Sequence, residues 1–217
     1  MNQTMRVFRQ FASLSLAVLV AAVLTNQAAA QQAQSHDSAF VLTSSTFKNG
    51  QTLPLSMIDN RVSNTVNVCT PDGSTGGDQS PELSWRNAPG RTRTFVVVAY
   101  DVSAAFTHWG MYNIRASVSE LPQNAGVAGS TYGMQVLNDF FAAEQYDGPC
   151  PPANFPPNNH RYVFTVYALD VDLHLPGSPD FLPVGETLYQ ALILASQHGH
   201  ILASAKLTGF YSSTPAQ

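Results

Sequence analysis

The segment GPCPPANFPPNNHRYVFTVYALD, residues 148–170, joins a proline-rich loop to a strand-forming run. Five prolines lie within residues 149–157, and each fixes φ and removes a backbone donor, so we expect a stiff loop. The run that follows is rich in the β-branched and aromatic residues that favour strands. Because side chains alternate across a strand, His160 and Tyr162 should share one face with Phe164. At the start of a strand, these two polar side chains either bind a ligand or form a structural hydrogen-bonded pair at the end of the sheet.

Further strand-forming runs, broken by turn residues, extend outward from this segment. They are FVLTSSTF (40–47), TFVVVAYD (94–101), THWGMYNI (107–114) and ILASAKLTGFY (201–211). The run at 94–101 is apolar without alternation, as in a fully buried strand. Only ETLYQALILASQHGH (186–200) has helical spacing, and Gly199 is a suitable stop for that helix. The pattern predicts a mainly β fold with an antiparallel core and a C-terminal helix before the last strand.

The first 30 residues have the pattern of an export signal. Arg6 and Arg9 precede an apolar stretch at 11–24, and a small-residue cleavage site ends at Ala30. The apolar stretch is shorter than the roughly 20 residues that a membrane span requires, although an uncleaved anchor remains an alternative. We therefore expect a periplasmic or secreted protein with no stable membrane span after cleavage.

Removal of the signal leaves 187 residues, of which eight are basic and fourteen acidic. This length is enough for one domain with its own core. We expect a flexible polar tail at 31–39 and a single domain at 40–217. The mild acidity and the absence of a basic stripe argue against nucleic acid as a partner.

Two cysteines, Cys69 and Cys150, remain after signal removal. In an oxidising compartment they either form a disulfide or remain as two separate buried thiols. Neither has a second cysteine at metal-ligand spacing. The pair His198 and His200 falls where the helix should stop, so we expect no metal and no other cofactor.

Asp101 ends the strand at 94–101, and His108 begins the next one. If the two side chains meet, the carboxylate would orient the imidazole, raise its pKa and make it a cationic donor for an anion. The alternative is a turn aspartate and an unrelated rim histidine. Gly148 permits the close approach of a ligand to the backbone. No nucleophile-elbow, zinc-protease, phosphate-loop or dinucleotide motif is present, so no residue is assigned as catalytic.

Taken in series, these segments resemble the phosphatidylethanolamine-binding protein family, and in particular its bacterial, Raf-kinase-inhibitor-like branch. The resemblance rests on CTPDGSTGGDQSPELSWRNAPGRTRTFVVVAYD, HWGMYNI, NDFFAAEQYDGPCPP, HRYVFTVYALD and ILASAKLTGFY, which together span most of residues 40–211. It implies a large antiparallel sheet packed on a smaller one, with a pocket for phosphate, phosphorylated head groups or other small anions at one end. The ligand-binding residues implied are Asp101, His108, Gly148, Pro151, Pro152, His160 and Tyr162.

One segment departs from the family pattern. The family has Asp-Pro-Asp-x-Pro after the buried strand, whereas this chain has Asp-Val-Ser-Ala-Ala at 101–105. The second aspartate is replaced by Ser103 and both prolines are missing. We therefore expect the pocket to be more open or flexible on this side, with weaker binding of phosphate or a different ligand.

The sequence leads to one main functional hypothesis and two alternatives. The main one is an exported binding protein whose histidines donate to an anion, with tighter binding below pH ~6.5. The first alternative is inhibition of a secreted protease or other hydrolase through the pocket rim. The second is an acid–base enzyme for small molecules that uses the same His, Asp and Tyr cluster. Absence of an activated nucleophile disfavours the enzyme.

Overall fold

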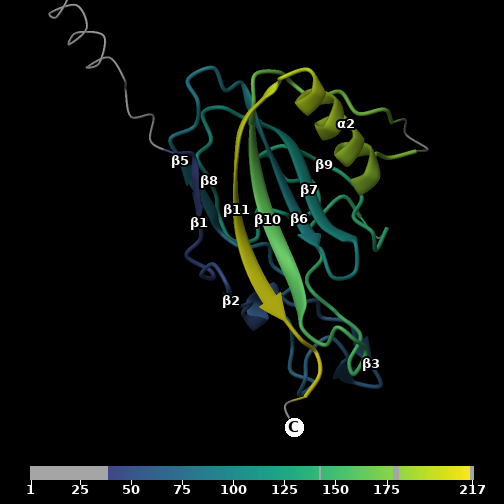
Figure 1. Ribbon diagram of the computed structural model, residues 1–217. Helices are drawn as coiled ribbons and strands as arrows, with labels where there is room; N and C mark the ends of the chain where they lie inside the picture. Colours follow the sequence, from purple (N-terminus) through teal and green to yellow (C-terminus); the bar gives the residue numbers. More distant parts are fainter. Residues whose placement is uncertain (1–38, 142, 178–180, 216–217) are drawn as a thin grey trace, which may run out of the picture. The chain divides into compact units, whose positions relative to one another are not determined.

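The computed structural model describes residues 39–141, 143–177 and 181–215 (Figure 1). The predicted signal at 1–30 and the predicted tail, apart from Ala39, lie outside the described residues and stay predictions. Within the described ranges, no helix has the length and apolar character needed to cross a membrane.

A six-stranded sheet contains the strong strand-forming runs. Its order is β2-β11-β10-β6-β7-β9, with β2 at Gln51–Thr52, β11 at Ile201–Tyr211, β10 at His160–Leu169, β6 at Thr94–Asp101, β7 at Phe106–Arg115 and β9 at Met134–Gln135. Neighbouring strands are antiparallel except for β2, which pairs parallel to β11. The sheet is therefore mixed, because the two-residue β2 joins its edge alongside the last strand.

Smaller strands complete the mainly β fold that the sequence predicts. The order β1-β5-β8 forms a three-stranded sheet from Val41–Thr43, Leu83–Arg86 and Glu120–Leu121. A separate ladder joins β3 (Val62–Ser63) to β4 (Val66–Asn67), after a short 3-10 helix at Leu55–Met57. The run predicted as a strand at 40–47 is paired only over β1, because Ser44 and Ser45 turn to bond Glu82 instead.

The main core lies on one face of the large sheet. There Phe95 of β6 packs on Trp85 of β5 with ring centroids 5.1 Å apart, and Phe164 of β10 packs on Phe47 at 5.2 Å. His160 and Tyr162 are buried on this same inner face, as the alternation predicts.

The predicted helix covers part of the other face. It is α2, at Gly185–Gln197, whose Leu188, Leu192 and Ala195 form a second apolar cluster with Val96 of β6 (Figure 1). Because one end of β6 is thus covered on both faces, its sequence shows no alternation. Gly199 follows the helix with φ +72°, the left-handed conformation expected at its end.

Cys69 and Cys150 form a disulfide, with Cα atoms 4.4 Å apart and 81 residues apart in sequence. Cys150 belongs to the proline loop, and Cys69 is fully buried. The bond therefore fixes the loop before β10 to the segment that follows β4.

Candidate functional site

The end of β6 and the start of β10 lie side by side, because the register pairs Asp101 with Tyr162. A cavity of about 250 Å³ opens at this end of the sheet. Six of the seven residues implied by the resemblance line it: Asp101, His108, Pro151, Pro152, His160 and Tyr162. Residues from four separated segments therefore converge on one site.

His160 and Asp101 form a buried pair at the base of the cavity. The Nδ1 atom of His160 lies 2.6 Å from Oδ2 of Asp101, and the two residues are 4% and 2% exposed. A carboxylate accepts hydrogen bonds, so Nδ1 carries the proton and donates. The carboxylate thereby fixes the ring orientation and leaves Nε2 for other partners.

The other oxygen of Asp101 organises the short loop between β6 and β7. Oδ1 accepts hydrogen bonds from the backbone N–H groups of Ser103 (2.8 Å) and Ala104 (3.2 Å). The Ser103 hydroxyl accepts from the backbone N–H of Arg161 at 3.0 Å. The first part of the loop without prolines is therefore tied to Asp101 and to β10. The expectation that the pocket is more open or flexible on this side stays a prediction.

His108 reaches the cavity through a β-bulge. Ala99 pairs with Trp109 and Tyr100 with Thr107, so His108 is the extra residue on β7. Such a bulge turns a side chain out of its normal alternation. As a result His108 and Trp109, although adjacent, both face inward, with the His108 ring 5.3 Å from that of Tyr162.

Asp101 does not hold His108, which was one of the two possibilities that the sequence leaves open. Nδ1 of His108 lies 2.8 Å from the backbone oxygen of Asp147 and donates to it, while Asp101 is engaged by His160. Burial lowers the pKa of His108, against the opposing effects of the Asp147 carbonyl and of nearby carboxylates. The lowered pKa of His108 favours the neutral ring over the cationic donor that an Asp101 contact would have given.

Two buried polar atoms at the cavity have no hydrogen-bond partner among the described residues: Nε2 of His160 and the hydroxyl of Tyr162. Burial and the charge of Asp101 raise the pKa of Tyr162, so the phenol keeps its proton. Its hydroxyl lies close enough to the Asp101 carboxylate for that contact to contribute to the raised pKa, but the two groups are not in hydrogen-bonding geometry, so the hydroxyl has no geometric partner in the described ranges. Buried polar groups are normally paired, so these two atoms are exceptions and are available to a bound molecule.

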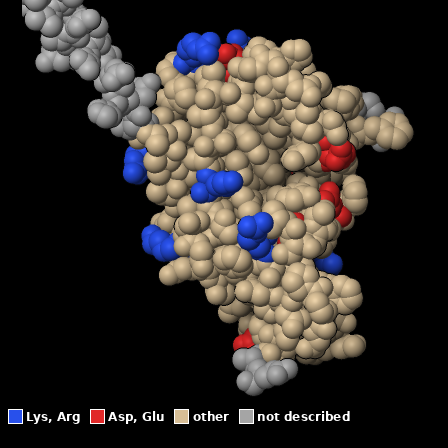
Figure 2. All heavy atoms as spheres, viewed as in Figure 1, with Lys and Arg blue, Asp and Glu red and all other residues tan. Residues whose placement is uncertain are grey.

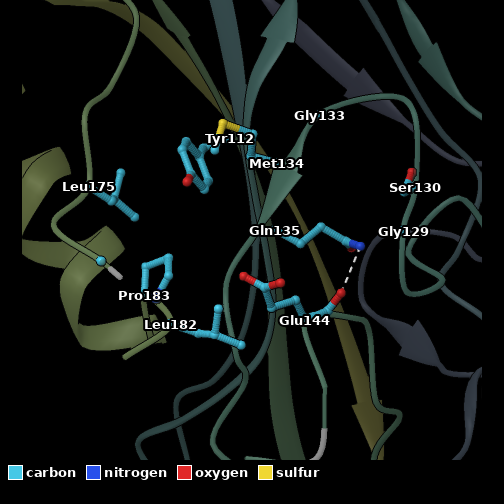
Figure 3. Close-up of a pocket in the computed structure, with 11 residues that line it drawn as sticks. Tyr112, Gly129, Ser130, Gly133, Met134, Gln135, Glu144, Leu175, Leu182 and Pro183 are labelled. Carbon is cyan, nitrogen blue, oxygen red and sulfur yellow. Dashed lines mark hydrogen bonds between the residues drawn. The ribbon is translucent and has the colours of Figure 1, made fainter. Parts of the chain in front are cut away.

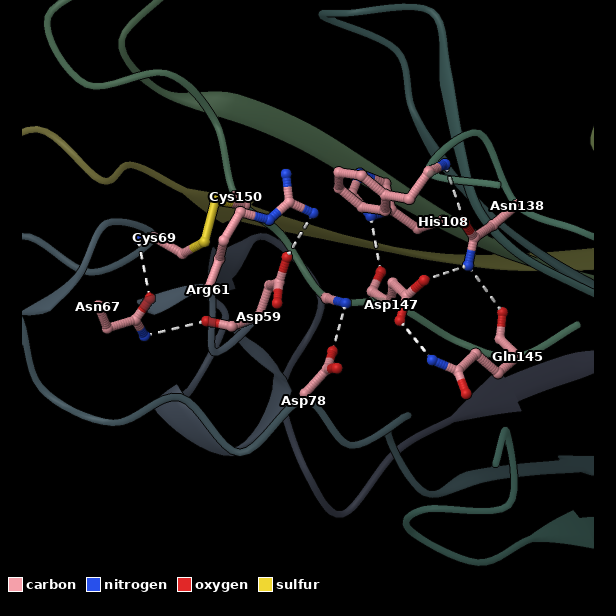
Figure 4. Close-up of polar contacts among 12 residues, drawn as sticks. Asp59, Arg61, Asn67, Cys69, Asp78, His108, Asn138, Gln145, Asp147 and Cys150 are labelled. Carbon is pink, nitrogen blue, oxygen red and sulfur yellow. Dashed lines mark hydrogen bonds and ion pairs between the residues drawn. A yellow bond between two sulfur atoms is a disulfide. The ribbon is translucent and has the colours of Figure 1, made fainter. Parts of the chain in front are cut away.

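Gly148 does not line the cavity. A Cβ atom at this position would lie 2.1 Å from the backbone oxygen of Met57 and 2.6 Å from the backbone nitrogen of Asp59. Its own N–H donates to Oδ1 of Asp78 at 2.7 Å (Figure 4). The glycine therefore permits close packing behind the cavity wall and not the approach of a ligand.

Carboxylates lie behind this wall (Figure 4). Burial raises the pKa of Asp78 to about 6, with further contributions from Asp59 and Asp147. Arg61 makes a 3.1 Å ion pair with Asp59. In the described part of the chain, the cluster of candidate metal ligands is Asp59 with the two cysteines, and the disulfide occupies both sulfur atoms.

The sequence model for phosphatidylethanolamine-binding proteins matches residues 43–212. The chain belongs to the phosphatidylethanolamine-binding protein family. Two relatives from Escherichia coli strain K12 agree with this. UPF0098 protein YbcL is 32% identical over 182 residues, which cover 80% of this chain and 88% of that protein. UPF0098 protein YbhB is 34% identical over 146 residues, covering 64% and 85%.

Solved structures of the phosphatidylethanolamine-binding protein family share the fold. The crystal structure of E. coli YbcL, described as a new member of the mammalian family, matches with a TM-score of 0.63 and 29% identity over 81% of this chain and 99% of that chain. A putative homologue from Chlamydia trachomatis matches with a TM-score of 0.58 and 29% identity, over 80% and 97%.

Four residues that line the cavity of this family member were not predicted from the sequence as ligand-binding residues: Ala104, Phe106, Phe140 and Cys150. Phe106 and Phe140 form an aromatic wall with ring centroids 4.7 Å apart, and Phe106 lies 5.0 Å from the His108 ring. The Arg61 guanidinium stacks over Phe140 at 4.5 Å. Cys150 was predicted only as a disulfide candidate, and Ala104 belongs to the loop that departs from the family pattern. Single aromatic residues in loops carry no distinctive pattern, so only the fold brings them to the cavity.

A larger cavity, of about 500 Å³, lies at the β9 edge of the large sheet (Figure 3). Its central polar side chain, Gln135, already accepts a bond from Trp109 and donates to the backbone oxygens of Val127 and Glu144. The smaller cavity is therefore the better candidate, because it contains buried polar atoms without partners.

Proposed function

We propose that this chain is an exported binding protein whose cavity at Asp101, His108, His160 and Tyr162 takes phosphate or a phosphorylated or other anionic head group. The observation that carries the proposal is the pair of unpartnered buried atoms, Nε2 of His160 and the Tyr162 hydroxyl. The family match supports binding of a small ligand. The signal-like sequence at 1–30 supports export.

The hydrogen-bonding chemistry of the site favours an anion that brings a proton. His160 and His108 both commit Nδ1–H to internal acceptors. In each neutral ring Nε2 is then an acceptor, while the Tyr162 hydroxyl can donate. A phosphate monoester with one protonated oxygen presents both a donor and acceptors to this set. A fully ionised anion would bind only if a ring takes up a proton at the same time.

Whether the proton comes with the anion or is taken up by a histidine ring, binding of the ionised anion is accompanied by uptake of one proton. The affinity for the anion should therefore rise as the pH falls. Because burial lowers the pKa of His108, this rise should continue below the usual histidine range near pH 6.5. Charge-assisted hydrogen bonds contribute about 1.5–3 kcal/mol each, and the translational and rotational entropy lost on binding offsets part of this. We therefore expect dissociation constants from about 1 µM to 1 mM.

The test is an NMR titration with phosphoethanolamine, inorganic phosphate and acetate, following the ring signals of His108 and His160. Saturable shifts at these rings that disappear in His160→Ala would support the proposal. The matched control is His200→Ala, which removes a similar His–Asp pair (2.9 Å to Asp170) outside the cavity and should leave the titration unchanged. No shift at millimolar ligand would overturn it.

A further inference from the structure

The outer face of the large sheet is only partly covered. Along β10, the side chains of Arg161, Val163, Thr165 and Tyr167 alternate with buried ones and point away from the main core. The helix α2 packs over the part of this face near Leu169 and leaves the other part open (Figure 1). An uncovered region therefore begins one residue from the candidate anion site, on the opposite face of the sheet.

This open region forms a groove of about 600 Å³ beside α2. Val98, Val163 and Tyr167 of the sheet line it on one side, and Leu188 and Leu192 of the helix on the other. The volume is within the range of about 300–1,000 Å³ that is usual for small-molecule sites. Its apolar walls would accommodate a hydrocarbon chain.

Two cations line the same groove. Arg161 and Lys206 are both exposed, and neither takes part in an ion pair with an acidic side chain of the described ranges. Lys206 pairs across the strands with Thr165, so it lies beside the open face of β10. In Figure 2, seen from the same side as Figure 1, basic groups lie over β10 and β11.

The groove is not basic throughout. A neighbouring hollow of about 200 Å³ shares Tyr100 and Tyr189 with it and contains the carboxylates of Asp139 and Glu186. An anionic group would be repelled from that side and attracted to the side of Arg161 and Lys206. The charge difference gives a ligand a single preferred orientation.

We propose that this groove is a second binding site, for a medium-chain carboxylate. The carboxylate lies between Arg161 and Lys206, and the hydrocarbon chain lies on the valines of the sheet and the leucines of α2. The site is separate from the anion cavity, because adjacent residues His160 and Arg161 point to opposite faces of β10.

The test is calorimetric titration of the protein with dodecanoate. We expect saturable binding that weakens as the chain is shortened, by up to about fourfold for each methylene that loses its buried position. Dodecyltrimethylammonium, which has the same chain and the opposite charge, should bind more weakly. Inorganic phosphate should not displace dodecanoate, which separates this site from the anion cavity.

The charge requirement is tested with the double variant Arg161→Gln/Lys206→Gln. Because both cations are exposed, we expect a combined loss of about tenfold in dodecanoate affinity. The matched control is Arg86→Gln/Arg115→Gln, which removes the same charge from exposed positions outside the groove and should bind normally.

Three results would overturn the proposal. The first is unchanged dodecanoate affinity in the groove double variant, and the second is competitive displacement by phosphate. The third is sedimentation as a dimer that the groove substitutions dissociate and dodecanoate does not, because a second copy would then be the occupant.

Discussion

Replacement of Tyr162 by Phe should stabilise the free protein while weakening its binding of anions. The side chain is 2% exposed, and its hydroxyl has no partner among the described residues. An unpaired buried hydroxyl costs about 1–3 kcal/mol in proteins. Removal of the oxygen leaves the ring and its contacts in place, so we expect a gain of about 1–2 kcal/mol in the free energy of unfolding. For a domain of this size, that corresponds to a rise in Tm of roughly 2–8 °C.

The same substitution removes a donor from the ligand. A hydrogen bond to a charged group is worth about 1.5–3 kcal/mol, so phosphoethanolamine affinity should fall by roughly 10- to 150-fold. Urea and thermal unfolding in a phosphate-free buffer would measure the first effect. Calorimetric titration with phosphoethanolamine would measure the second.

Tyr146→Phe is the matched control. Tyr146 is equally buried, but its hydroxyl donates to the backbone oxygen of Met57 at 2.9 Å and lies outside the cavity. This control should lose about 1 kcal/mol of stability and keep its affinity. If Tyr162→Phe instead loses stability and binds phosphoethanolamine normally, the hydroxyl is satisfied within the protein and the reasoning fails.

Three further changes test the support of the cavity wall. Gly148→Ala should destabilise the protein by about 3 kcal/mol or more, measured by urea unfolding, because the new Cβ would lie 2.1 Å from the backbone oxygen of Met57; a neutral result would mean that this backbone moves freely. Cys69→Ser/Cys150→Ser should lose up to about 4–5 kcal/mol, because the disulfide closes a loop of 81 residues, and equal unfolding midpoints would contradict this. Asp78 has its pKa raised by burial from 3.8 to about 6, so its contribution to stability is full below pH ~4 and is lost as the pH rises through 6. Asp78→Asn should therefore be about 1–2 kcal/mol more stable than the parent at pH 8 and similar at pH 4, after allowance for solvent screening, and the reverse order would refute the assignment.

Periodicity predicted the elements that lie in regular structure. Alternation in β10 correctly predicted that His160 and Tyr162 share the inner face, and the spacing of Leu188 and Leu192 correctly predicted the buried side of α2. The lack of alternation in β6 was informative too, because it reflects cover on both faces. These features depend on local repeats, which the sequence contains in full.

The partners of the site residues were harder to predict because they depend on register. Asp101 lies one strand away from both histidines, and only the pairing with Tyr162 decides that it meets His160. The orientation of His108 follows from a β-bulge opposite Ala99 and Tyr100. No sequence pattern predicts this bulge. The bulge turns His108 inward to the Asp147 carbonyl, and burial then lowers the pKa of its ring.

Nε2 of His160 and the Tyr162 hydroxyl stay without partners only if the proline loop that forms the facing wall of the cavity keeps its position. From behind, the wall is fixed by the Cys69–Cys150 disulfide and by the close packing of Gly148 on Met57. Cys150 lines the cavity, but its bonded partner Cys69 and the Gly148–Met57 contact do not, so the wall is fixed without the cavity being filled. If the wall were free, Nε2 of His160 and the Tyr162 hydroxyl could gain hydrogen bonds by relaxation of the loop. The rigid support and the two unpartnered atoms, one an acceptor and one a hydroxyl, are thus two parts of one arrangement, which under the proposed function keeps the site prepared for a ligand at a cost to the stability of the free protein.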